Sequence, residues 1–266
     1  MKAFYFGPPQ RQLFGVYHMP LNGAGRKSGV VLCYPLGQEY IRVHRAFRQL
    51  AVLLARTGLH VLRFDYLGCG DSAGEGDDGS PAQWITDISA AVDGLRALGG
   101  SERVSLVGLR LGATLAAVAG SERGDIENAV LWEPVVSGRE YVKEQLAAHC
   151  AWVRSEWPGR KNGGLERGLR TAVLGFPFTE GMQTELAGLD LLRLSRAPAG
   201  RVLIVENRIS PAAERLRVVL QANQVATDHE RTGEPDFWVH EAGVNTPLVP
   251  PRALRAVVSW LGEVCA

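Results

Sequence analysis

The chain has 266 residues, enough for one large domain or for a domain with an insertion, and enough to bury a substantial core. Its 29 basic and 28 acidic side chains give a net charge of +1, so charge provides no argument for binding to nucleic acid or to a membrane surface. No stretch reaches the ~20 apolar residues that a membrane span needs, and the sequence therefore predicts a soluble cytoplasmic protein.

The first half of the chain alternates short apolar runs with amphipathic stretches, which is typical of strands and helices around a mostly parallel sheet. The expected strands are Lys2 to Phe6, Gln12 to His18, Gly29 to Tyr34, His60 to Tyr66, Val104 to Val107 and Ala129 to Glu133. The expected helices are Arg42 to Thr57, Pro81 to Leu98 and Leu111 to Ala119. The first two strands should form an antiparallel hairpin, and Ser80 should cap the second helix.

The second half contains a helical, irregular stretch at residues 137–198, which predicts a cap inserted into a core made of residues 1–136 and 199–266. The sheet then resumes. The expected elements are a strand from Arg201 to Glu206, a helix from Pro211 to Gln221, a last strand from Asp236 to His240 and a closing helix from Pro251 to Val264. An insertion at the carboxyl edge of a sheet usually shapes a pocket.

The run Gly108-Leu109-Arg110-Leu111-Gly112 has the spacing of the G-x-S-x-G nucleophile elbow, with an apolar strand before it and a helix after it. Glycines are needed on both sides because a Cβ there would collide with neighbouring backbone. Arginine stands at the nucleophile position. It stays protonated and is no nucleophile, so ordinary acyl-serine chemistry is excluded.

Two roles for Arg110 follow from its chemistry. At the start of a helix, its charge would add to free backbone N–H groups and could hold a carboxylate or phosphate of a ligand. Alternatively, it pairs internally with an acid at a strand end, and Glu133, Glu206 and Asp65 should all reach the same sheet edge.

Other residues complete the candidate site. His240, at the end of the last expected strand, and Glu206 form a candidate catalytic pair. The backbone N–H of Leu111, with donors from the segment that holds Leu36 and Gln38, would form an oxyanion hole. Cys69 is a much weaker candidate as a substitute nucleophile, because a buried packing thiol in a tight glycine-aspartate loop explains it better.

Cysteine usage argues against a metal or a disulfide framework. The four cysteines, which are Cys33, Cys69, Cys150 and Cys265, lie far apart and show neither CxxC nor CxxH spacing. We therefore expect reduced thiols, no metal and no cofactor.

Several segments together resemble the serine-aminopeptidase-like branch of the α/β-hydrolase superfamily, and more narrowly the exosortase A system-associated hydrolases. These segments are residues 4–18, 30–51, 61–74, 107–116 and 130–142. The resemblance implies an α/β-hydrolase fold and hydrolysis of esters, amides or thioesters through Ser, His and an acid. The serine position is Arg110, however, and the acid position has no clear match. Superfamily members without the triad, such as the bottromycin epimerase, carry out other chemistry on this fold.

Three functions are compatible with these residues. The first is a non-serine enzyme of a biosynthetic pathway that acts on a small acidic or carbonyl-containing substrate, with Arg110 and Glu133 near it. The second is a ligand-binding pseudo-hydrolase without catalysis, and the third is a hydrolase in which His240 activates water. We expect a small-molecule or peptide partner, no nucleic acid and no membrane, and we leave open whether the chain forms a homodimer.

Overall fold

A mixed sheet of eight strands forms the centre of the chain, in the order β1-β2-β4-β3-β5-β6-β9-β10. The computed structural model describes residues 1–21, 26–156, 171–239 and 249–266. The strands are β1 Lys2–Phe6, β2 Leu13–His18, β3 Ser28–Cys33, β4 His60–Phe64, β5 Arg103–Leu109, β6 Asn128–Trp132, β9 Arg201–Glu206 and β10 Ala226–Arg231. Pairing is antiparallel for β1 with β2 and for β2 with β4, and parallel for the rest. The expected opening hairpin is confirmed.

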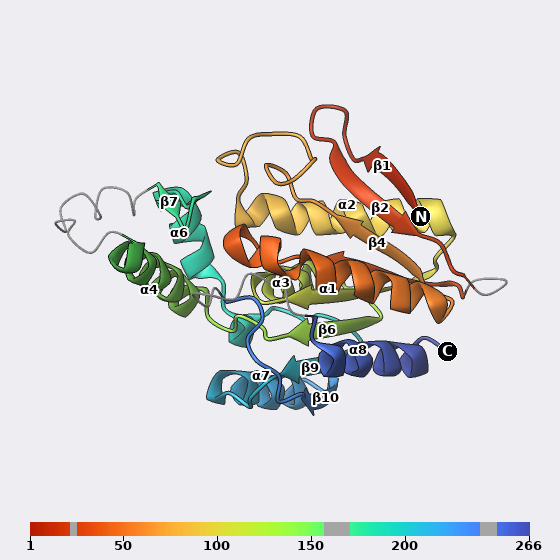
Figure 1. Ribbon diagram of the computed structural model, residues 1–266. Helices are drawn as coiled ribbons and strands as arrows, with labels where there is room; N and C mark the ends of the chain where they lie inside the picture. Colours follow the sequence, from red (N-terminus) through yellow and green to blue (C-terminus); the bar gives the residue numbers. More distant parts are fainter. Residues whose placement is uncertain (22–25, 157–170, 240–248) are drawn as a thin grey trace.

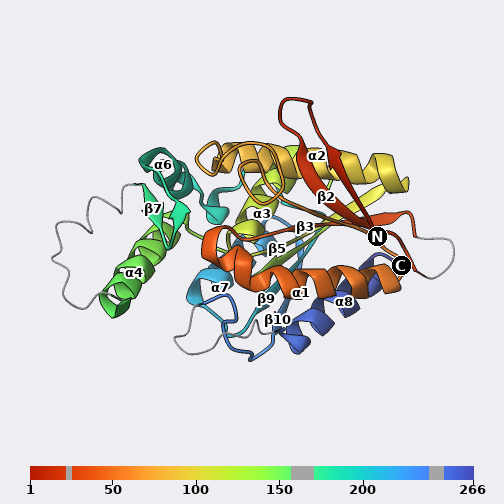
Figure 2. The ribbon, with the colours of Figure 1, turned by 45° about the horizontal axis from the view of Figure 1, so that its top comes forward.

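Helices cover both faces of this sheet. They are α1 Gly37–Arg56, α2 Pro81–Gly99, α3 Leu111–Arg123, α7 Pro211–Ala222 and α8 Pro251–Val264. Helix α1 contacts α8, and α2 contacts α3. The two pairs lie on opposite sides of the strands (Figures 1 and 2). This arrangement, a mostly parallel sheet between two helical layers, is the α/β-hydrolase fold that the sequence predicts.

The central strands are buried on both faces because both faces are covered. Every residue of β3 and β6 is buried, and their sequences are nearly continuous apolar runs, as expected for such strands. The caps also follow from sequence: the Ser80 hydroxyl accepts a hydrogen bond from the backbone N–H of Gln83 at 3.3 Å, with Pro81 in the first turn of α2.

Between β6 and β9 the chain leaves the sheet. This part contains α4 Gly138–Glu156, β7 Ala172–Val173, β8 Phe176–Pro177, α6 Glu180–Gly188 and the short 3-10 helix Leu191–Arg193. We call residues 138–156 and 171–193 the α4–α6 segment. It lies at one end of the sheet, to the left in Figures 1 and 2.

Two predicted boundaries were wrong. Helix α1 begins at Gly37 rather than Arg42, so the segment that holds Leu36 and Gln38 leads directly into the helix. The last strand is β10 rather than Asp236 to His240. Residues 236–239 form a turn, closed by a hydrogen bond of 3.1 Å from the backbone N–H of Val239 to the carbonyl of Asp236, and His240 lies outside the described residues. Strand β10 is an edge strand with both faces largely exposed, so it has polar residues and no apolar signal.

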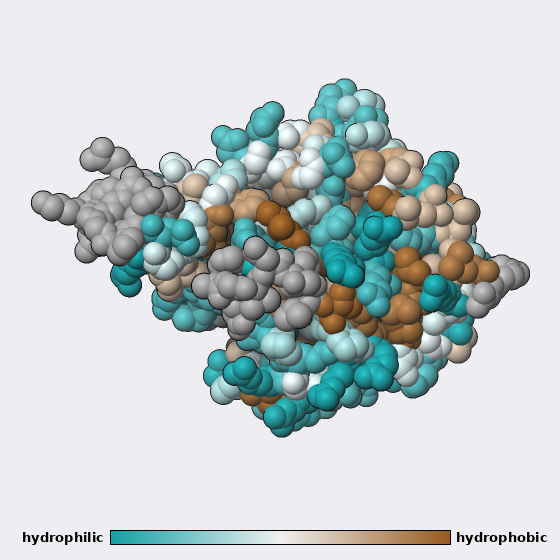
Figure 3. Space-filling view, viewed as in Figure 1, coloured by the Kyte–Doolittle hydropathy of each residue, from teal (hydrophilic) through white to brown (hydrophobic). Residues whose placement is uncertain are grey.

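None of the helices in the described ranges is long and apolar enough to cross a membrane. On the face shown in Figure 3, apolar side chains lie among hydrophilic ones. Exposed large apolar side chains, such as Tyr5 and Ile41, come from different elements of the fold. Scattered exposure of this kind is normal for a folded chain and by itself indicates no binding surface.

Candidate functional site

The turn between β5 and α3 has the geometry of a nucleophile elbow. Arg110 is the single residue between the two elements, with φ 54° and ψ −124°, a backbone conformation that non-glycine residues rarely adopt. A Cβ on Gly108 would collide with the backbone at the start of α3, and a Cβ on Gly112 with the backbone that follows β3. The predicted need for both glycines is confirmed, and Arg110 occupies the elbow position.

The Arg110 side chain is held by the protein itself. Its Nε donates to Oε1 of Glu39 at 3.2 Å, and its Nη2 donates to Glu144. The guanidinium carbon lies 5.8 Å from the ring centroid of Tyr141 and 5.6 Å from that of Trp238, within the range of cation–π attraction. The side chain is only 12% exposed. Two carboxylates and two aromatic rings therefore enclose this cation.

The pKa values of Arg110 and Glu39 depend on each other and on the neighbouring Glu144. Glu39 lies in the first turn of α1, and its Oε1 also accepts a hydrogen bond from Gln145 at 3.4 Å. Burial raises the pKa of Glu39, and although Arg110 opposes this effect, the net direction is upward. Burial alone would lower the pKa of Arg110, but Glu39 and Glu144 outweigh it and raise that pKa. The guanidinium stays charged, and its charge is matched internally.

The internal partners are not the acids that we expected. Glu133, Glu206 and Asp65 all lie in the described part of the chain, and none forms an ion pair with Arg110. Glu133 instead accepts a hydrogen bond from the backbone N–H of Asn207. Burial raises the pKa of Glu133 to about 7, an effect that the nearby Glu206 reinforces. Asp65 accepts hydrogen bonds from α1 and from its own loop.

The carboxylate of Glu206 has hydrogen-bond partners on β10 and at the start of α7. Its carboxylate accepts a hydrogen bond from His229 Nε2 at 2.9 Å and another from the Ser210 hydroxyl at 2.8 Å, and Ser210 in turn caps α7. His229 belongs to β10, the strand that sequence patterning missed. Because His240 lies outside the described residues, the proposed pairing of Glu206 with His240 stays a prediction.

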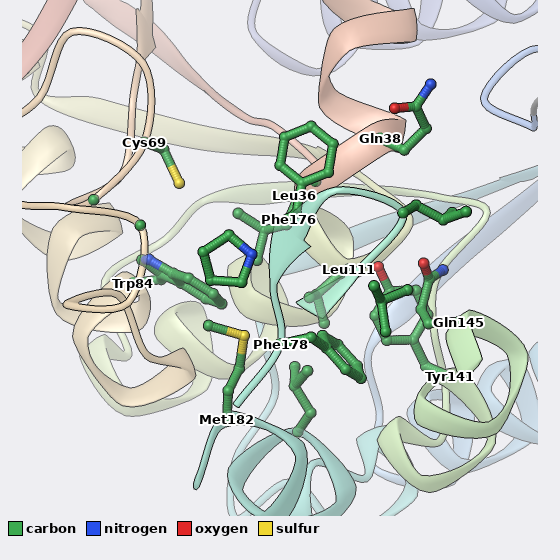
Figure 4. A pocket seen from close by; sticks show the side chains of 17 residues that line it. Leu36, Gln38, Cys69, Trp84, Leu111, Tyr141, Gln145, Phe176, Phe178 and Met182 are labelled. Atoms are coloured by element: carbon green, nitrogen blue, oxygen red, sulfur yellow. The ribbon is translucent and has the colours of Figure 1, made fainter. Parts of the chain in front are cut away.

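A pocket lies beside the elbow, between the sheet edge and the α4–α6 segment (Figure 4). Its volume is about 90 Å³. The lining residues, mostly apolar or aromatic, are Leu36, Gly37, Gln38, Gly68, Cys69, Gly76, Trp84, Leu111, Tyr141, Gln145, Val173, Leu174, Phe176, Pro177, Phe178, Met182 and Leu186. Three residues expected to face a ligand, Leu36, Gln38 and Leu111, are therefore brought together. Arg110 and Glu133 are not among the residues that line it.

Two helix starts border this pocket. Leu36 precedes α1 and Arg110 precedes α3, and neither residue caps its helix with a side chain. The first N–H groups of a helix have no partner inside that helix, and the helix dipole makes this end positive. Backbone N–H groups near Gly37 and Leu111 can therefore donate to an oxygen atom in the pocket, in the way that an oxyanion hole does.

The thiol in this pocket is poorly suited to attack a substrate. Burial, together with the charges of Asp65 and Asp87, raises the pKa of Cys69 to about 12. Since the thiolate is the reactive form, almost none is present near neutral pH. In the described ranges, no group of three or more His, Cys, Asp or Glu side chains is arranged to hold a metal ion.

Sequence reasoning missed the residues that hold Arg110. Glu144 and Tyr141 lie on α4, whose contacts with the core no local pattern discloses, and Trp238 lies in a turn that was expected to be a strand. Glu39 could have been found. It directly follows the predicted oxyanion segment, and this position alone brings its backbone close to the elbow.

Comparison with known proteins identifies the fold family. The sequence profile described as "Hydrolase_4: Serine aminopeptidase, S33" matches residues 15–171, more than half of the chain. No curated protein has a sequence that matches this chain at a significant level. The profile match covers the sheet from β2 to β6, the elbow and part of the α4–α6 segment.

Solved structures of three hydrolases have a similar fold. An esterase of Pyrococcus furiosus aligns with a TM-score of 0.68 at 15% identity, covering 100% of this chain and 91% of its own. Est1E of Butyrivibrio proteoclasticus, with ferulic acid bound, gives 0.63 at 17%, covering 98% and 97%. Proline iminopeptidase of Mycobacterium smegmatis gives 0.63 at 15%, covering 99% of both chains. At such low identity, these similarities establish a common fold alone.

Proposed function

This chain belongs to the serine aminopeptidase (S33) family of α/β-hydrolases, and on that premise we propose that it binds a small, mainly apolar molecule without acyl-serine chemistry. The pocket beside the elbow would hold this molecule. A carbonyl oxygen of the ligand would accept hydrogen bonds from backbone N–H groups at the starts of α1 and α3. The chain would thus act as a ligand-binding pseudo-hydrolase.

The observation that carries this proposal is the internal pairing of Arg110. A guanidinium that already contacts Glu39 and Glu144 gains little from a ligand carboxylate, because the new anion would have to displace a paired one. For this reason, Arg110 does not support the hypothesis of an acidic substrate. A carbonyl-containing ligand keeps its donors, since they are backbone groups.

The pocket walls also favour an apolar ligand. Trp84, Phe176, Phe178 and Met182 converge on the pocket from α2, the β7–β8 hairpin and its exit, and α6 (Figure 4). Burial of apolar surface against such walls drives ligand binding. We further propose that the α4–α6 segment is a cap and that Arg110 fastens it to the core through Glu144.

The wider setting is part of the same proposal. The resemblance to exosortase A system-associated hydrolases supports a role in a biosynthetic pathway of that system, in the cytoplasm. A small molecule or peptide would be the partner.

The first experiment measures hydrolysis of p-nitrophenyl butyrate and of a butyryl thioester. We expect no turnover above buffer by the wild type, because neither Arg110 nor Cys69 supplies a nucleophile. Turnover that disappears in Cys69→Ala would overturn the proposal in favour of a cysteine hydrolase. Turnover that persists in Cys69→Ala would overturn it in favour of water activation.

The second experiment measures binding of 2-hexanone and hexanoate by calorimetry. We expect 2-hexanone to bind more tightly, and Met182→Trp, which fills the pocket, to weaken it by at least about tenfold. Met19→Trp, at a residue that is 51% exposed, is the matched control and should change nothing. Tighter binding of hexanoate, lost in Arg110→Met, would instead support an anion anchor.

One observation favours a second candidate, an enzyme that moves protons without a nucleophile. Glu133 directly follows β6, next to the elbow strand, and its pKa of about 7 suits a general base for a substrate that extends beyond the lining of the pocket, to which Glu133 does not belong. Such an enzyme would exchange the α-protons of 2-hexanone in D2O, and Glu133→Gln would abolish the exchange. Absence of exchange in the wild type excludes this candidate for that ketone.

A further inference from the structure

A second buried arginine lies away from the elbow, on β4. Arg63 is the penultimate residue of this strand, which pairs on one side with β2 and on the other with β3, and only 6% of Arg63 is exposed. A guanidinium remains charged at any physiological pH, and burying a charge is costly unless it is paired. The groups that contact Arg63 therefore decide how its charge is compensated.

The groups that contact Arg63 are neutral. Its Nε donates to His18 Nε2 at 3.2 Å, and its Nη1 donates to the Tyr34 hydroxyl at 3.0 Å. Burial, reinforced by Arg63 itself, lowers the pKa of His18 to about 4, so this imidazole is uncharged near neutral pH. Burial raises the pKa of Tyr34, and its phenol is uncharged as well. Among the described residues, no carboxylate forms an ion pair with Arg63.

The carboxylate of Asp65, another residue of the same pocket, forms hydrogen bonds with other groups. Asp65 accepts a hydrogen bond from the Tyr40 hydroxyl at 2.8 Å through Oδ1, and one from the backbone N–H of Asp71 at 3.1 Å through Oδ2. Both oxygens of Asp65 are thus used within the loop and α1. Its charge acts on Arg63 only from a distance, without a direct contact.

Arg63 lines a pocket of about 260 Å³. The polar walls include Tyr34, Tyr40 and His44, and Phe14 and Val16 of β2 supply apolar wall on the other side. His44 is exposed, whereas Arg63 and Tyr34 are buried. The pocket shares no lining residue with the pocket beside the elbow, although both touch the loop between β4 and α2.

We propose that this pocket binds a small monocarboxylate, whose carboxylate group pairs with the Arg63 guanidinium while its apolar end lies against Phe14 and Val16. The planar guanidinium matches a carboxylate geometrically, and the Tyr34 hydroxyl, which accepts from Arg63, has its own proton as a further donor. Asp65 and Asp71 also line the pocket, and their charge opposes a dianion. For that reason the site favours a carboxylate over phosphate.

The test is calorimetric titration of the full chain with sodium propionate in a buffer free of other carboxylates. We expect saturable binding with a Kd of about 1 mM or tighter. Arg63→Gln should weaken it about 10- to 100-fold, since it removes a charge-assisted pair. Arg45→Gln removes the same charge from an exposed α1 residue that lies outside this pocket and is not among the charges that shift the pKa of His18 or His44, so it should leave the affinity within about twofold.

A second pair of variants keeps the test decisive if Arg63→Gln does not fold. His44→Glu, at an exposed residue of the pocket, supplies a competing carboxylate and should abolish propionate binding, whereas His44→Gln should retain it. No saturable binding by the wild type, equal loss in Arg63→Gln and Arg45→Gln, or equal retention in both His44 variants would each overturn the proposal. Tighter binding of phosphate than of propionate would overturn the assignment to a carboxylate.

Discussion

Two little-exposed arginines in the described part of the chain, Arg110 and Arg63, solve the same electrostatic problem in different ways. Arg110 lies between two carboxylates, Glu39 and Glu144, and two aromatic rings. Arg63 lies between a neutral imidazole and a neutral phenol and borders an open pocket. Residue type is the same in both places, and the surroundings decide what each cation can do.

The difference shows that an arginine at a catalytic position is not thereby a ligand-binding residue. Arg110 occupies the elbow, yet its charge pairs with Glu39 of α1 and Glu144 of α4. Arg63 lies on an ordinary strand, and of these two arginines it is the one that no carboxylate of the described residues contacts directly. Charge balance is therefore a better guide to a binding site here than position in the family motif.

The largest effect is expected from Arg110→Met. This substitution leaves Glu39 buried without its cation, and removal of one partner from a buried pair typically costs about 3 to 5 kcal/mol. The free energy of unfolding in urea should fall by that amount. In Arg110→Met with Glu39→Gln, no buried charge is left over, and much of the loss should be recovered. If the double variant is no more stable than the single one, Glu39 does not depend on Arg110.

Glu133, which pairs with neither arginine, should give stability a pH dependence. Its pKa is about 7 in the folded chain against an ordinary 4.5, so the folded state binds the proton more tightly. Its contribution is therefore complete below about pH 4.5 and is lost as pH rises through 7, by at most about 3 kcal/mol. Urea unfolding between these pH values should show this decline in the wild type, and a smaller one in Glu133→Gln. Parallel curves would contradict the assignment.

Tyr34→Phe tests whether neutral partners matter to Arg63. Loss of the hydroxyl leaves Nη1 of a buried guanidinium without its acceptor, which typically costs about 1 to 3 kcal/mol. Tyr5→Phe, at a residue that is 56% exposed, is the matched control and should be neutral. If both variants unfold at the same urea concentration, water replaces the Tyr34 hydroxyl without cost, and the contrast between the two arginines becomes weaker.

The fold was predictable where burial leaves a mark on sequence. Strands β3, β5 and β6 lie between two helical layers, and their continuous apolar runs disclosed them. Strand β10 could not be recognised, because an edge strand exposed on both faces carries Thr, Asp, His and Glu without an apolar period. Because β10 was not recognised, the last strand was expected at Asp236 to His240, with His240 at its end. The last strand of the structure carries His229 instead.

The site was predictable only as far as backbone geometry determines it. Leu36, Gln38 and Leu111 were found because the family motif fixes which backbone segments meet at the pocket. The partners of Arg110 were not found, since Glu144 comes from α4, a helix whose docking depends on long-range packing. Side-chain charge pairing between distant segments leaves no local pattern to detect.

The smallest effect is expected from Glu144→Gln, and it separates the two partners of Arg110. Glu144 is 52% exposed, whereas Glu39 is 8% exposed, so solvent screens the outer pair far more than the inner one. The free energy of unfolding should fall by only about 0.2 to 1 kcal/mol. Because Glu144 belongs to α4, however, the backbone amides of α4 should exchange with deuterium faster, while those of α3 stay protected. Glu140→Gln, which breaks a pair with Lys143 inside the same helix, is the control. Unequal exchange between these two variants would locate the stabilisation in the contact between α4 and the elbow, and equal exchange would place it in the helix alone.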